Sequence, residues 1–171
     1  MVKPILQILA ILTLLAGLLR TADAVPGWVT GIPRGVVVAA TLDEARSVSG
    51  ISVGFSALSD FVTAPRGIRV SRPPSAGLAL TARRLSDGRS LSLYRLSTGD
   101  PARLYRPLFP FHEITIKVAG RPAQLRASRL PDGSVVEEVE WQENSLRTIL
   151  RFDGPTLELL ALAQRLAEVS R

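Results

Sequence analysis

The chain of 171 residues suggests one domain, and it contains no cysteine, which excludes disulfides, thiolate catalysis and thiolate metal sites. Its 21 Lys and Arg residues outnumber its 15 Asp and Glu residues. The excess is uneven, because residues 60–129 hold 13 basic and 4 acidic residues, whereas residues 130–171 hold 4 basic and 8 acidic ones.

The first 24 residues have the composition of a secretory signal peptide. Lys3 precedes an apolar run from Ile8 to Leu19, and the small residues Ala22 and Ala24 follow it. This order predicts cleavage near Ala24 and an extracytoplasmic protein, periplasmic or secreted. The alternative is an uncleaved single-pass anchor at residues 4–19, although these 16 residues are fewer than the roughly 20 that a spanning helix needs.

Residues 25–40 form an entry segment in which glycine and proline are followed by a short predicted strand at Val36–Ala40. A single domain over residues 41–171 follows. Thr41 and Glu44 have the spacing of a capping box, which predicts a brief helix from Leu42 to about Ser47.

The middle of the chain predicts extended segments and a hairpin. Extended structure is expected around Ile51–Ser56 and Gly67–Val70. The pair Asp87-Gly88 separates two strand-like segments and predicts a hairpin turn, because Asp-Gly accepts a positive φ. Residues 97–111 contain three prolines and predict a loop.

The last third predicts four successive antiparallel strands and a closing helix. Apolar and polar residues alternate from Glu113 to Phe152, and predicted turns interrupt the alternation at Gly120, at Asp132-Gly133 and at Gln142–Ser145. Residues 153–156 then end the sheet and start a helix. Its apolar stripe comprises Leu159, Leu160, Ala163, Leu166 and Ala167. We therefore expect an α+β fold, in which a sheet of about six to eight strands packs against a C-terminal helix.

The basic zone at residues 60–129 has two interpretations. It could bind an anionic lipid, an anionic cell-envelope polymer or another protein, and export makes nucleic acid an unexpected partner. Alternatively, the basic zone and the acidic C-terminal third neutralise each other.

The sequence contains few groups suited to catalysis. His112 is the only histidine, and no G-x-S-x-G nucleophile pattern or phosphate-binding glycine motif occurs. We therefore expect no catalytic, cofactor-binding or metal-binding residues. The Asp-Gly pairs at 87, 132 and 153 are interpreted as turns rather than calcium loops. An envelope hydrolase that uses His112 and nearby carboxylates remains the alternative.

Four glutamates lie close together at positions 137, 138, 140 and 143, on either side of Trp141. In a strand, Glu138 and Glu140 share one face, and Glu137 and Trp141 share the other. Arg147 and Arg151 occur on the matching face of the next strand. We interpret Glu138 and Glu140 as cross-strand ion pairs on a solvated face, and Trp141 as a core residue.

The order of elements resembles that of a bacterial extracytoplasmic family, domain of unknown function 4367. The matching segments are "TLDEARSVSGISVGF", "ITIKVAGRPAQL", "VEEVEWQENSLRTILRF" and "TLELLALAQRLAEV". The third segment has "ENS" where the family often has a glycine turn. The resemblance implies a non-enzymatic binding, sensing or regulatory domain, found behind a signal peptide or on the outer side of anti-sigma-factor-like membrane regulators. No catalytic residue carries over.

Overall fold

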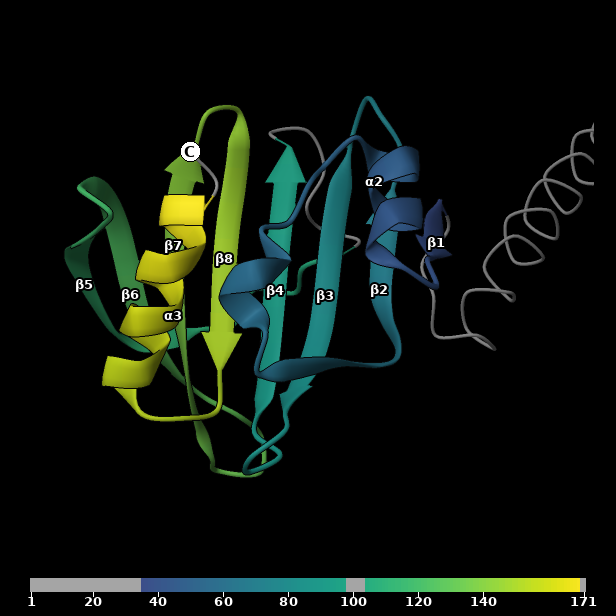
Figure 1. Cartoon of the computed structure of the whole chain (residues 1–171). Helices are drawn as coiled ribbons and strands as arrows, with labels where there is room; N and C mark the ends of the chain where they lie inside the picture. Colours follow the sequence, from purple (N-terminus) through teal and green to yellow (C-terminus); the bar gives the residue numbers. More distant parts are fainter. Residues whose placement is uncertain (1–34, 98–103, 170–171) are drawn as a thin grey trace, which may run out of the picture. The chain divides into compact units, whose positions relative to one another are not determined.

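Eight strands form one sheet in the order β1-β2-β3-β4-β8-β7-β6-β5, and all neighbouring strands are antiparallel (Figure 1). The computed structural model describes residues 35–97 and 104–169, so the predicted signal peptide lies outside the described residues, as does nearly all of the irregular entry segment. The strands are β1 (Val36–Val38), β2 (Phe61–Ser71), β3 (Gly77–Arg84), β4 (Ser90–Ser97), β5 (Pro110–Val118), β6 (Arg121–Arg129), β7 (Val135–Glu143) and β8 (Leu146–Phe152).

One face of the sheet, called the helix face here, packs against α2 (Leu42–Ser49), the 3-10 helix η1 (Phe55–Leu58) and α3 (Thr156–Val169) (Figure 1). The expected α+β architecture with a C-terminal helix is therefore confirmed. The larger hydrophobic core lies between these helices and the sheet. Within the described part of the chain, no helix has the length and apolar character that crossing a membrane requires.

Helix α2 begins at the predicted capping box. The Thr41 hydroxyl accepts a hydrogen bond from the Glu44 amide at 3.2 Å, and the Glu44 carboxylate accepts one from the Ala40 amide at 2.7 Å. The helix ends at Gly50, whose positive φ of 72° lets its amide reach the Arg46 carbonyl. The helix is thus confirmed and continues to Ser49.

Helix α3 buries the apolar stripe that was predicted, with one difference. Its buried residues are Leu159, Leu162, Ala163, Leu166 and Ala167. Leu160, which the prediction included, is only partly buried. The stripe still spans one side of the helix, and it packs on the sheet as expected.

The expected extended structure around Ile51–Ser56 is wrong. This segment is irregular and leads into η1, with Ile51 and Leu58 buried in the helix-face core. A Cβ on Gly54 would lie 2.6 Å from Cγ1 of Val169. The segment therefore packs against the end of α3 instead of pairing with a strand.

Strand β2 is longer than the predicted Gly67–Val70. Its register with β3 shifts between Thr63 and Ile68, where Pro65 and Gly67 interrupt the alternating pattern. A Cβ on Gly67 would lie 2.4 Å from the Thr81 carbonyl oxygen, so the two strands approach each other too closely there for a larger residue.

The opposite side of the sheet, the second face, carries a smaller core. Residues 98–103 of the predicted loop lie outside the described residues, but Leu104 and Tyr105 are buried. They pack against Ala79, Tyr94, Leu96 and Ile149. The chain between β4 and β5 therefore covers part of the second face.

Candidate functional site

The four glutamates of β7 divide between the two faces of the sheet, as predicted. Glu138 and Glu140 project from the second face, whereas Glu137 and Glu143 share the helix face with Trp141. The predicted turn at 142–145 is shorter in the structure. Strand β7 continues to Glu143, and Asn144, with a φ of 53°, makes the turn with Ser145.

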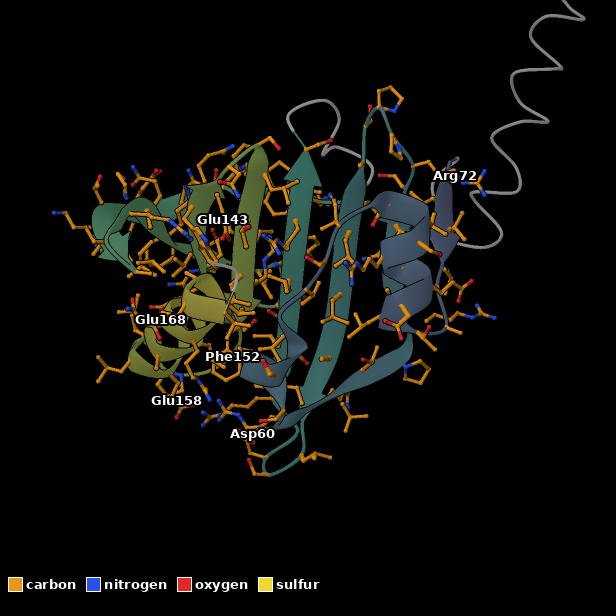
Figure 2. The ribbon with its side chains drawn as sticks, turned by 45° about the horizontal axis from the view of Figure 1, so that its top comes forward. Asp60, Arg72, Glu143, Phe152, Glu158 and Glu168 are labelled. Carbon is orange, nitrogen blue, oxygen red and sulfur yellow. The ribbon has the colours of Figure 1, made fainter. Side chains whose placement is uncertain are left out.

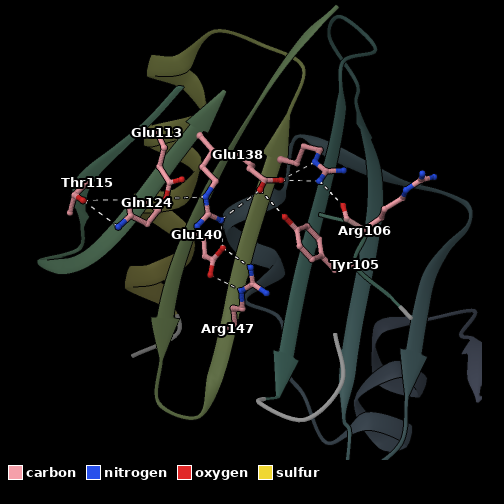
Figure 3. Close-up of polar contacts among 10 residues, drawn as sticks. Tyr105, Arg106, Glu113, Thr115, Gln124, Glu138, Glu140 and Arg147 are labelled. Carbon is pink, nitrogen blue, oxygen red and sulfur yellow. Dashed lines mark hydrogen bonds and ion pairs between the residues drawn. The ribbon is translucent and has the colours of Figure 1, made fainter. Parts of the chain in front are cut away.

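Glu138 is buried, which corrects the prediction that it lies on a solvated face. It accepts hydrogen bonds from the Tyr105 hydroxyl at 2.7 Å and from Arg151 at 2.8 Å and 3.2 Å (Figure 3). Its side chain is 3% exposed. Arg151 also donates to the Arg106 carbonyl, so the segment that covers Glu138 is attached at two points.

Tyr105 lies at the centre of this network. Burial and the hydrogen bond to Glu138 raise the pKa of its hydroxyl, which keeps it protonated as a donor. Its ring makes an edge contact with Tyr94, at 5.1 Å between ring centroids. The guanidinium groups of Arg147 and Arg151 lie 5.3 Å and 5.6 Å from the ring centroid.

Glu140 makes the cross-strand pair that the sequence predicted. Arg147 donates two hydrogen bonds to its carboxylate, at 2.6 Å and 2.7 Å, and Arg126 donates a third (Figure 3). Burial raises the pKa of Glu140, but the hydrogen bonds from Arg147 and Arg126 outweigh it, so the pKa lies below its ordinary value. An ionised, bidentate carboxylate of this kind is not suited to act as a general acid.

Glu143 forms a buried charge cluster on the helix face. Arg95 and Arg121 each lie 3.2 Å from its carboxylate, and its side chain is 3% exposed. Arg95 also donates to the Ser52 carbonyl, and Arg121 donates to the Ala167 carbonyl near the end of α3. Glu143 therefore links the sheet to the irregular segment before η1 and to α3, a role that the sequence did not indicate.

Glu137 lies beside the start of α3. The Thr156 hydroxyl, in the first turn of that helix, donates to its carboxylate at 3.0 Å. A carboxylate near a helix N-terminus also interacts favourably with the helix dipole. Each of the four glutamates therefore has a structural partner, and Trp141 is buried in the core as predicted.

His112 is not assembled with a carboxylate. It lies on β5, where it is exposed, and no hydrogen bond or ion pair joins its side chain to another described residue. Glu113 follows it in the strand and forms an ion pair with Arg126 at 3.3 Å. Adjacent residues of a strand project to opposite faces, so His112 and Glu113 cannot act as a pair.

Part of the basic zone is neutralised by the acidic C-terminal third. Five arginines of the zone form ion pairs with Glu138, Glu140, Glu143 or Glu158. These arginines are Arg84, Arg89, Arg95, Arg121 and Arg126. For them, the neutralisation interpretation agrees with the structure.

Four other arginines, around β2 and β3, have no ion-pair partner among the described residues. We call Arg66, Arg69, Arg72 and Arg83 the arginine surface. Ile68, Val70 and Ala82 point into the helix-face core, so the neighbouring Arg69 and Arg83 project from the second face. Figure 2 shows Arg72 near the β1 edge, away from Glu158 and Glu168.

An open depression of about 460 Å³ lies beside the start of β2 and the β3–β4 turn. Arg84 and Arg165 line it, with Ser59, Asp60, Phe61, Leu85 and Ser86. Arg84 pairs with Asp87 and Glu158 and lies 4.8 Å from the centroid of the Phe152 ring. Arg84 is therefore held by its neighbours, and Arg165 supplies the available positive charge.

Comparison with known proteins adds no relative: the chain matches no protein-family model, no curated protein and no solved structure.

Proposed function

We propose that the chain is an exported, non-enzymatic binding or regulatory domain of the bacterial cell envelope, as its resemblance to domain of unknown function 4367 implies. The signal-like residues 1–24 support export. The glutamates of β7 support a role other than hydrolysis, because arginine, tyrosine or threonine partners hold them.

The arginine surface carries the proposal for a partner. Planar guanidinium groups recognise phosphate through paired hydrogen bonds, and the envelope offers phosphate in anionic lipids and in anionic polymers. Arg69 and Arg83 project from one face of the sheet without an acidic partner among the described residues. We therefore propose a phosphate-bearing envelope polyanion as the ligand.

Matched charge removal tests this surface. One variant of the full chain carries Arg69→Gln and Arg83→Gln, and its control carries Arg46→Gln and Arg165→Gln, which remove the same charge from α2 and α3. Binding is measured to phosphatidylglycerol vesicles, to neutral phosphatidylcholine vesicles and to soluble poly(glycerol phosphate). At about 1 kcal/mol for each arginine near an anionic lipid surface, the first variant should bind about thirtyfold more weakly.

The anionic probes distinguish the two sources of phosphate, and added salt should weaken either interaction. Equal losses in the test variant and its control would contradict a localised surface. Failure of the unaltered chain to bind either anionic probe would reject the ligand class.

The N-terminus of the mature protein distinguishes export with cleavage from retention as a membrane anchor. Mass spectrometry of the protein from its native envelope should find a chain that begins near Val25. A chain that still begins at Met1 and fractionates with membranes would support the alternative, a membrane-anchored extracytoplasmic regulator that retains residues 4–19.

A further inference from the structure

Strand β5 forms a long outer edge of the sheet (Figure 1). It has nine residues, whereas β1 at the opposite edge has three. Among the described residues β5 pairs with β6 alone. Phe111 and Ile114 on this strand are 61% and 42% exposed. A long edge with exposed apolar side chains favours pairing with another strand.

The turn after β5 determines which of its backbone groups face outward. Val118 and Arg121 form the last pair before a two-residue turn, in which Ala119 and Gly120 have φ values of 48° and 79°. The residues that flank such a turn exchange hydrogen bonds, and hydrogen-bonded residues then alternate along the strand. The amides and carbonyls of Glu113, Thr115 and Lys117 therefore point toward the free edge.

We propose that β5 pairs antiparallel with β5 of a second copy of this chain, about a two-fold axis at Thr115. This register places Glu113 opposite Lys117 of the second copy, and the symmetry repeats that pair. It also sets Ile114 opposite Ile116 of the second copy. Opposite charges and branched apolar residues are favourable cross-strand pairs.

Charge complementarity selects this register. An axis at Glu113 or at Lys117 would place like charges opposite each other, which is destabilising. An axis at Ile114 or Ile116 would leave neither charge opposite its complement. Only the axis at Thr115 both pairs outward-facing residues with one another and places Glu113 opposite Lys117 of the second copy.

A cysteine cross-link tests the register, because the chain contains no cysteine of its own. Across a hydrogen-bonded antiparallel pair the Cα atoms are about 5.5 Å apart, within disulfide range. The full-length Thr115→Cys variant in detergent should therefore form a disulfide dimer under mild oxidation. Lys117→Cys is the matched control, since the two cysteines would be about 13 Å apart along the strands.

A charge exchange tests the same contact without a covalent bond. Glu113→Lys should weaken dimerisation about tenfold or more, as measured by sedimentation of the full chain. The Glu113→Lys and Lys117→Glu double variant should restore it. Glu113 also pairs with Arg126, and the double variant does not restore that pair, so recovery would report on the contact between copies.

Three results would overturn the proposal: an unaltered chain that sediments as a monomer at its highest soluble concentration, equal cross-linking of both cysteine variants, or a double variant that dimerises no better than Glu113→Lys. None of these results depends on the arginine surface, because Arg69 and Arg83 lie on β2 and β3. The proposed function and the proposed dimer can therefore fail separately.

Discussion

Tyr105 donates a hydrogen bond of 2.7 Å to Glu138, a buried carboxylate 33 residues further along the chain. The pair joins the segment between β4 and β5 to the middle of the sheet. It also explains why Glu138 is buried on a face that none of the described helices covers.

Removing this hydrogen bond should destabilise the fold. Tyr105→Phe keeps the ring but leaves Glu138 without one of its donors, and hydrogen bonds to charged groups contribute about 1.5–3 kcal/mol. The free energy of unfolding in urea should fall by about that amount. Tyr94→Phe is the control, because no hydrogen bond of the Tyr94 hydroxyl occurs within the described residues. Equal losses in both variants would contradict the role of the Tyr105 hydroxyl.

The ion pairs of Glu140 should make stability depend on acidic pH. Burial raises the pKa of Glu140 but the hydrogen bonds from Arg147 and Arg126 lower it further, so the folded-state pKa lies below the unfolded one. This contribution is present above the unfolded pKa, about 4.3, and is lost as pH falls through the folded pKa. Between pH 7 and pH 3, the free energy of unfolding measured in urea should therefore fall less in Glu140→Gln than in the unaltered chain. An equal dependence on pH in the two chains would contradict the lowered pKa of Glu140.

Removing Glu143 alone from the buried charge cluster should lower the free energy of unfolding more than removing Glu143 and Arg95 together. Glu143→Leu leaves the buried Arg95 without its carboxylate, and loss of one partner of a buried pair costs about 3–5 kcal/mol. Adding Arg95→Leu removes the more buried of the two charges that Glu143 pairs with, so the double variant should be more stable than Glu143→Leu alone. A double-mutant cycle of unfolding free energies measures this coupling. Additive losses would mean that the two charges act independently.

A side chain at Gly154 should displace Phe152. A Cβ there would lie 2.0 Å from the Phe152 ring, and that ring is 1% exposed and makes an edge contact with Phe61. Gly154→Ala should therefore destabilise the fold by about 1–3 kcal/mol, an ordinary cost of overpacking. In a chain that already carries Phe152→Leu, Gly154→Ala should lower stability less than it does in the unaltered chain. Thermal unfolding of the four chains tests whether the ring is the cause.

The sequence predicted the elements whose signals are local. Alternation of Ile114, Ile116 and Val118 indicated β5, the spacing of Thr41 and Glu44 indicated α2, and the apolar stripe indicated α3. These patterns reflect the side-chain periods of strands and helices, which a short stretch of sequence contains in full.

The missed features depend on contacts between distant parts of the chain. Glu138 follows the pattern of a solvated strand residue, and the sequence around it does not indicate that Tyr105 covers it. Glu143 was placed in a turn, although Arg95 and Arg121 hold it in β7. Pro65 and Gly67 interrupt the alternating pattern of β2, so the sequence predicted only its residues 67–70. In each case tertiary contacts decide the outcome, and sequence periodicity does not report them.

The strand order determines when the sheet can close as the chain is synthesised. Strands β1 to β4 form one meander and β5 to β7 another, and β8, the last strand, lies between them. A chain that emerges from a ribosome with its N-terminus first would hold two half-sheets until residues 146–152 arrived, and the edges of β4 and β7 that face β8 would stay unpaired until then. Arg151 would arrive with them, so the charge of Glu138 would lack its closest cation until that moment. Closure of the sheet and neutralisation of its buried acid would thus occur together, when β8 joins the two half-sheets.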